Sequence, residues 1–198
     1  MKQPARGATG DLPIVEFPHQ KGWAAWLGKN HGKSAGVWLR MFKKDSGLPS
    51  VNYAEALEVA LCYGWIDGLK RSDSATAWLQ KFTPRGKRST WSKINREKAL
   101  ALIESGKMKP AGLAEIERAK ADGRWDQAYD SPKAATVPED LQAALNANTR
   151  AKAFFATLNS ANRYAILYRV QTAKKAETRA KRIQQFIQML EKHEKLHP

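Results

Sequence analysis

The chain has 198 residues, of which 42% are hydrophobic and 27% charged, enough for one packed domain with a small appendage and unlike a disordered chain. Its 34 basic and 19 acidic residues give a formal charge of +15, which suits anionic partners but also serves solubility alone. No stretch approaches the roughly 20 apolar residues of a membrane span, and residues 1–13 lack a signal-peptide pattern, so we expect a cytoplasmic protein without membrane insertion. The single cysteine, Cys62, excludes an intramolecular disulfide and is expected to be a buried structural thiol.

The first part of the chain mixes helical and strand patterns after a flexible tail expected at residues 1–16. Trp23 and Leu27 lie one helical turn apart, and Asn52 with Glu55 resembles a capping box that begins another helix. Aromatic and β-branched runs bounded by turn residues predict strands. The predicted elements are a helix at 20–31, a strand at 36–44, a helix at 52–63 and strands at 65–71 and 76–82. A short polar turn joins the last two strands, which favours a hairpin within a small antiparallel sheet.

The rest of the chain is predicted to be helical. Glycines, prolines and polar breaks separate six helical segments, expected from 91 or 92 to 105 and at 110–121, 138–147, 149–158, 160–173 and 176–193. In the first of these, Ile94, Ala101, Leu102 and Ile103 are expected to face inward, and Thr136-Val-Pro-Glu139 resembles a second capping box.

These patterns together predict an α+β fold, a small antiparallel sheet with flanking helices followed by a helical C-terminal module. The expected organisation is a tail at 1–16, an α+β domain at 17–129, a linker at 130–138 and a helical module at 139–198.

Catalytic and cofactor motifs are missing from the sequence. It contains no Walker A or dinucleotide glycine pattern and no G-x-S-x-G, and its four histidines have no His or Cys at metal-ligand spacing. The sequence therefore indicates no metal and no cofactor, and it favours a protein that is not an enzyme.

A basic block at residues 62–98, with nine basic and three acidic residues, is the best candidate for a binding site. Its arginines precede a predicted helix start, where unpaired N–H groups and guanidinium groups suit phosphate or carboxylate. The candidate ligand-binding residues are Trp65, Lys70, Arg71, Arg85, Arg88, Ser89, Trp91, Ser92 and Asn95. The alternative is that the hydroxyls only cap the helix, the arginines are solvated and the tryptophans belong to the core.

Two further groups of residues have both a functional and a structural interpretation. Asp67 is a weak candidate for a general base, and its structural alternative is to pair with a cation or stabilise a turn. A second basic surface could contact nucleic acid, an acidic partner or a membrane surface, or be an ordinary surface helix. This surface consists of Lys174, Lys175, Arg179 and Arg182.

Several motifs resemble a bacterial family, the YdeI/OmpD-associated or bacteriocin-protection proteins, from about residue 18 to residue 198. The stretches that carry the resemblance are Gly36-Val-Trp-Leu-Arg40, Tyr53-Ala-Glu-Ala-Leu57, Gly64-Trp-Ile-Asp-Gly68, Phe82-Thr-Pro-Arg85, Trp91-Ser-Lys-Ile-Asn95, Met108-Lys-Pro-Ala-Gly-Leu113 and Thr172-Ala-Lys-Lys-Ala-Glu-Thr-Arg179, with Ala176 where such proteins often have Pro. The resemblance implies an N-terminal α+β part similar to the YjbR/CyaY group and a helical C-terminal module. It also implies a link to a porin and to antimicrobial-peptide tolerance, and supplies no catalytic residues. Iron binding, suggested by fold analogy alone, is not expected because the sequence lacks an acidic ridge.

Three functional hypotheses follow from these observations. The first is a non-enzymatic protein that binds an anionic ligand, with nucleic acid the leading candidate, through its basic surface. The second is a stress-response or antimicrobial-peptide tolerance protein that acts through a protein partner. The third is an enzyme on a small anionic substrate, with Asp67 as the base.

Overall fold

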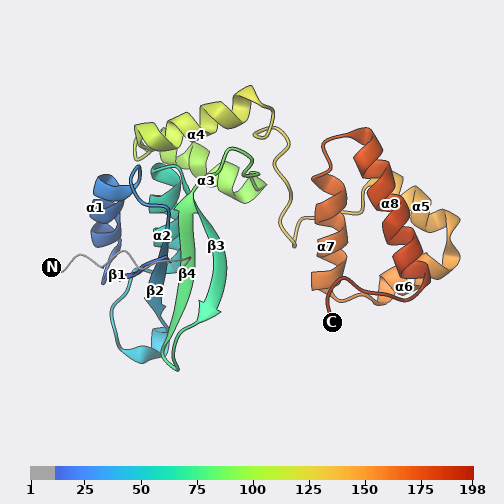
Figure 1. The fold of residues 1–198 in the computed structure, drawn as a ribbon, viewed down its shortest axis with the longest axis horizontal. Helices are drawn as coiled ribbons and strands as arrows, with labels where there is room; N and C mark the ends of the chain where they lie inside the picture. The colour runs from blue at the N-terminus through green and yellow to red at the C-terminus, as the bar shows by residue number, and fades with distance from the viewer. Residues whose placement is uncertain (1–11) are drawn as a thin grey trace. The chain divides into compact units, whose positions relative to one another are not determined.

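The computed structural model describes residues 12–198, which divide into two compact units (Figure 1). The N-terminal unit comprises residues 12–89 and 95–125, and the C-terminal unit comprises residues 90–94 and 126–198. A small sheet with flanking helices is followed by further helices, so the α+β class predicted from the sequence is confirmed.

Apart from β1 and the 3-10 turn η1, which were not predicted, the elements of the first part of the chain end close to the predicted residues. In chain order they are β1 (Ile14–Glu16), α1 (Gln20–Asn30), β2 (Val37–Phe42), the 3-10 turn η1 (Lys44–Ser46), α2 (Tyr53–Cys62), β3 (Trp65–Ser72), β4 (Ala77–Pro84), α3 (Lys93–Glu104) and α4 (Pro110–Ala121). The hairpin of β3 and β4 is present, with an irregularity between Asp67 and Lys70.

The sheet is mixed, which corrects the expectation of a purely antiparallel one. Its strand order is β1-β2-β4-β3, with β1 parallel to β2 and the other pairs antiparallel. Strand β1 lies inside the segment expected to be a flexible tail, and Ile14 pairs with Trp38. A three-residue strand is too short to show alternation, and its pairing partner lies more than twenty residues away, so local patterns do not reveal it.

An aromatic cluster forms the core of the N-terminal unit. Trp23 and Phe82 are fully buried, with ring centroids 5.7 Å apart, and Trp65 lies edge-on to Trp23 at 6.3 Å. The indole N–H of Trp23 donates to the carbonyl of Ala56 at 3.1 Å, so this buried polar atom is satisfied. The cluster joins α1, α2 and the sheet, and it gives the hairpin a rigid base.

Sequence signals at helix starts were right at one helix and wrong at another. Asn52 Oδ1 accepts from the Glu55 N–H at 3.0 Å and Glu55 Oε2 accepts from the Asn52 N–H at 3.1 Å, which confirms the capping box of α2. The second expected box is wrong, because α5 begins after Pro138 without a side-chain cap.

The predicted inner face of α3 also needs correction. Leu102 is buried as expected, but Ile94 is 45% and Ile103 is 38% exposed, and Ala101 is exposed too. Ala99 and Leu102, three residues apart, form the buried stripe instead. The helix thus buries a narrower face than its apolar residues suggest.

The C-terminal unit contains four more helices around their own core. They are α5 (Glu139–Ala147), α6 (Thr149–Thr157), α7 (Ser160–Gln171) and α8 (Ala176–Glu191). Leu141 and Leu145 of α5, Ile166 of α7 and Leu190 of α8 are almost fully buried in one cluster. No helix within residues 12–198 is both long and apolar enough to cross a bilayer.

Candidate functional site

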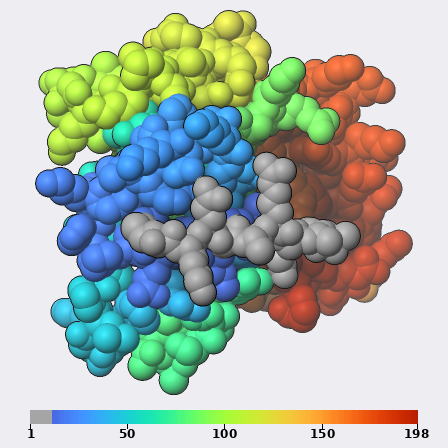
Figure 2. Space-filling view, turned by 60° about the vertical axis from the view of Figure 1, so that its left-hand side comes forward, coloured from blue at the N-terminus to red at the C-terminus, as the bar shows by residue number. Residues whose placement is uncertain are grey.

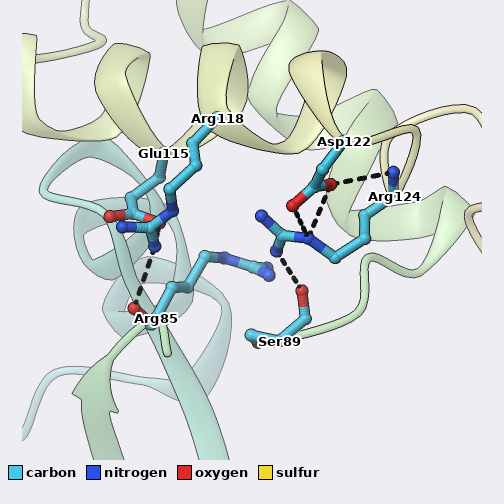
Figure 3. Close-up of polar contacts among 6 residues, drawn as sticks. All are labelled: Arg85, Ser89, Glu115, Arg118, Asp122 and Arg124. Carbon is cyan, nitrogen blue, oxygen red and sulfur yellow. Dashed lines mark hydrogen bonds and ion pairs between the residues drawn. The ribbon is translucent and has the colours of Figure 1, made fainter. Parts of the chain in front are cut away.

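The loop after β4 is held by a group of charged residues in the N-terminal unit (Figure 3). We call this group the arginine cluster. It consists of Arg85, Glu115, Arg118, Asp122 and Arg124. The hairpin supplies the first residue, and α4 with the turn that follows it supplies the other four. The loop itself, residues 85–89, contains several of the candidate residues singled out in the sequence.

Arg124 is the most deeply buried member of the cluster, with 3% of the residue exposed. Its Nε lies 2.8 and 2.7 Å from the two carboxylate oxygens of Asp122, and its Nη1 donates to the Ser89 carbonyl at 2.6 Å. The ion pair neutralises the buried guanidinium, and the second contact fixes the far end of the loop. Arg124 therefore has a clear role in holding the loop.

The near end of the loop is fixed by Arg118. This side chain forms an ion pair with Glu115, one turn earlier on α4, and donates to the Arg85 carbonyl at 3.3 Å. Burial raises the pKa of Glu115, and the three neighbouring guanidinium groups act against this increase. The backbone N–H of Arg85 also donates to the Gly64 carbonyl at 2.9 Å.

The cluster carries more positive than negative charge. Three guanidinium groups face two carboxylates, and Figure 3 shows the 5%-exposed side chain of Arg85 extending toward Arg124. Within residues 12–198, Arg118 Nε and Arg124 Nη2 are buried without a hydrogen-bond partner. The buried arginines can therefore add to a positive potential around the loop, while Lys87 and Arg88 at its tip are exposed.

Two basic candidate residues of β3, Lys70 and Arg71, lie toward the other end of the hairpin. Lys70 Nζ lies 4.2 Å from the ring centroid of Trp78, and the guanidinium of Arg71 lies 4.2 Å from that of Trp38. Both cations are exposed, so each cation–π contact orients a charge that water and ligands can reach. Asp67 accepts a hydrogen bond from the Tyr53 hydroxyl at 2.8 Å, a pairing that joins β3 to α2.

The two candidate tryptophans are buried. Trp65 is 1% exposed and its indole N–H donates to the His31 carbonyl at 3.1 Å, while Trp91 is 2% exposed. Neither ring offers an open face on which a base could stack. Ser92 pairs with Tyr129 as an isolated bridge in the C-terminal unit, and Asn95 lies in the first turn of α3.

The second basic surface includes side chains already engaged within the C-terminal unit. Arg179 forms an ion pair with Asp140 and donates to the Val170 carbonyl at 2.9 Å. This pairing lowers the pKa of the Asp140 carboxyl and raises that of the arginine. Arg182 donates to the Arg169 carbonyl. Lys174 and Lys175, just before α8, are exposed.

Sequence reasoning missed the four members of the cluster that come from residues 115–124. Acidic and basic residues balance in this part of the chain, so local composition gives no signal. The spacing of Glu115 and Arg118 marks a helical ion pair, but nothing local points to the hairpin loop. Among residues 12–198, no group of three or more His, Cys, Asp or Glu side chains is placed to hold a metal ion.

Comparison with protein families assigns the two parts of the chain separately. Residues 15–115 match the family described as "Domain of unknown function (DUF8412)", and residues 134–193 match "Bacteriocin-protection, YdeI or OmpD-Associated". The resemblance noted in the sequence is thus confirmed for the C-terminal part, whereas the N-terminal motifs fall in the other family. Comparisons with curated proteins and with solved structures returned no match. Because the first match spans more than half of the 198 residues, the chain belongs to the DUF8412 family and carries a bacteriocin-protection, YdeI or OmpD-associated domain at its C-terminal side.

Proposed function

We propose that this protein binds a polyanion, with nucleic acid as the best fit, through exposed cations of the N-terminal unit. The main observation in support is that one hairpin and its loop expose four cations, Lys70, Arg71, Lys87 and Arg88. None of these four side chains forms an ion pair with another residue of the range 12–198. Their charges therefore remain available to an external anion.

The spacing of these cations favours a polyanion over a single phosphate. Lys70 pairs with Gln80, and five further residues of extended chain lead to Arg85. At about 3.3 Å per residue, the two basic groups lie roughly 15–20 Å apart along the hairpin. One phosphate cannot reach both groups, whereas a nucleic acid backbone presents phosphates repeatedly over that length.

The anchoring of the loop reduces the entropic cost of binding. Arg118 holds the Arg85 carbonyl and Arg124 holds the Ser89 carbonyl, so the residues that carry the exposed cations are fixed at both ends. Since Trp65 and Trp91 are buried, affinity is expected to come from phosphate contacts, with little preference for base sequence.

Neutralising the loop tip tests the proposal. Lys87→Gln with Arg88→Gln is expected to weaken binding of a labelled single-stranded oligonucleotide roughly ten-fold at about 50 mM salt. Binding that makes two fewer phosphate contacts releases fewer counterions. The slope of log K against log salt should therefore also become shallower by about 1.4. Fluorescence anisotropy across a salt series measures both quantities.

The matched control removes the same charge elsewhere in the unit. Lys29→Gln with Lys33→Gln neutralises two exposed lysines near the end of α1, and it should leave the affinity within about two-fold and the slope nearly unchanged. An equal loss of affinity in both double variants would mean that net charge alone, and not the position of the loop cations, determines binding. Absence of binding by the unmodified protein at about 50 mM salt would refute the proposal.

A second candidate function is protection through a protein partner, which the description of the C-terminal match favours. The C-terminal unit also contains a groove of about 680 Å³ between α5 and α8, and half of its lining residues are alanine or isoleucine. Recovery of a protein partner after nuclease treatment would support this candidate if Ala180→Trp, which fills the groove, abolishes it. A partner released by nuclease would favour nucleic acid instead.

A further inference from the structure

A separate pocket of about 320 Å³ opens between α1, α2 and the end of α3 in the N-terminal unit. Its buried floor is formed by Val59, Cys62 and Leu102, and Ala24 and Tyr63 complete the walls. Figure 2 shows α1 in blue beside the yellow-green residues of α4 on this face of the unit. The volume lies at the lower end of the range for small-ligand pockets, so the occupant must be a small molecule.

The rim of the pocket is cationic. Lys21, Lys107 and Lys109 line it and are exposed, whereas Glu58 is the one acidic residue in the lining. None of these four side chains forms an ion pair with another residue in the described part of the chain. The lining thus carries an excess of two positive charges over an apolar floor.

The lysine charges act on the floor of the pocket as well as on its rim. Burial raises the pKa of the Cys62 thiol; the charge of Lys109 opposes that increase, Glu58 adds to it, and Lys107 opposes it again. Lys109 is also held in place, since its backbone N–H donates to the Cys62 carbonyl at 3.2 Å. Three lysines thus outnumber one glutamate around an apolar cavity, an arrangement that favours a ligand with an apolar body and a negative head.

We infer that this pocket binds a small organic anion, a carboxylate or phosphate monoester attached to an aromatic or short aliphatic body. The apolar body fills the space above Val59 and Leu102, and the anionic group meets the lysines of the rim. This inference is independent of polyanion binding, because the hairpin cations take no part in the pocket.

Three probes that share a phenyl ring test the role of charge: benzoate, its neutral isostere benzamide, and phenyl phosphate, which has a larger anionic head. Titrations followed by NMR chemical shifts should show that benzoate or phenyl phosphate binds at least about ten-fold more tightly than benzamide. The anion that binds more tightly identifies the head group that the pocket prefers. The bound anion should also slow alkylation of Cys62 by iodoacetamide, because that thiol is the single cysteine and lies in the floor.

Two variants separate the charge of the rim from the volume of the pocket. Lys107→Gln with Lys109→Gln should weaken binding of the preferred anion about ten-fold, and Ala24→Leu should block it without changing charge. The Lys29→Gln and Lys33→Gln protein is the charge control, and the Lys87→Gln and Arg88→Gln protein should bind the probes normally. Equal binding of benzamide, or full binding by the Ala24→Leu protein, would overturn the inference.

Discussion

Replacing Asp122 by asparagine is expected to destabilise the N-terminal unit by about 2–4 kcal/mol. The carboxylate accepts two short hydrogen bonds from the guanidinium of Arg124, a residue that is only 3% exposed. Asparagine keeps the shape and removes the charge, so a buried cation loses its counter-ion. Removing one partner of a fully buried pair costs about 3–5 kcal/mol, and the 45% exposure of the Asp122 side chain reduces that figure.

Urea unfolding followed by tryptophan fluorescence measures this effect. Six of the seven tryptophans belong to the N-terminal unit, so the signal follows that unit. Glu117→Gln is the matched control on the same helix, because that carboxylate is 65% exposed and pairs with Lys120 only at the surface. Its loss should stay within about 0.5 kcal/mol. If the two variants were equally stable, the arginine cluster would not hold the loop.

A second replacement distinguishes the lost charge from a general loss of packing. Arg124→Met in the Asp122→Asn background removes the unpaired cation and keeps an unbranched side chain in place of the aliphatic part of the arginine. The double variant is therefore expected to be more stable than Asp122→Asn alone, although Ser89 loses its contact with the guanidinium. A double variant less stable than the single one would assign the effect to packing.

The helices and the hairpin could be predicted because their determinants are local. Asn52 and Glu55 cap α2 within one turn, and Pro110 occupies the first position of α4, where its missing N–H costs nothing. The single strand β1 could not be predicted, since it depends on pairing with Trp38 and its neighbours in β2. The prediction of the inner face of α3 was wrong for a similar reason, because tertiary packing decides which apolar side chains are covered.

The candidate site was predictable only in the part that local composition marks. The basic loop was visible in the sequence through Arg85 and Arg88, but the residues that anchor it come from a segment with balanced charge. Arg124 reaches the Ser89 carbonyl across 35 residues of sequence, a contact that no spacing rule contains. Burial likewise separates the two kinds of arginine: Arg85 and Arg124 are enclosed, and Arg88 is exposed. The structure thus separates buried arginines of the arginine cluster from the exposed cations of the basic block.

The contact between α2 and α4 positions the arginine cluster, and Gly112 permits it. A Cβ at this position would lie 2.5 Å from the Cys62 carbonyl oxygen and 2.7 Å from that of Leu61, and it would also clash with Met108 Sδ. Two of these atoms belong to the backbone and cannot move aside easily. Gly112→Ala therefore forces α4 away from α2, and overpacking of this kind costs about 1–3 kcal/mol or more.

Helix propensity alone predicts that Gly112→Ala raises the stability, whereas the steric conflict predicts that it lowers the stability, so the two effects can be told apart. Alanine favours a helix interior over glycine by about 1 kcal/mol, so a variant without steric conflict would gain stability. We expect a net loss of about 2–3 kcal/mol in urea unfolding, because the backbone contacts outweigh that gain. Gly86→Ala is the control, since a Cβ there meets nothing within 4 Å, and it should change stability by less than about 0.5 kcal/mol.

A shift of α4 should have consequences at both ends of the helix. At its start, Cys62 becomes more accessible, so iodoacetamide should alkylate the Gly112→Ala protein faster than the Gly86→Ala protein. Further along, the contact from Arg118 to the Arg85 carbonyl lengthens, and amide exchange in residues 85–89 should accelerate. If alkylation and amide exchange both accelerate while the stability stays normal, α4 still supports the loop. Unchanged exchange and unchanged alkylation would mean that the loop is held without it.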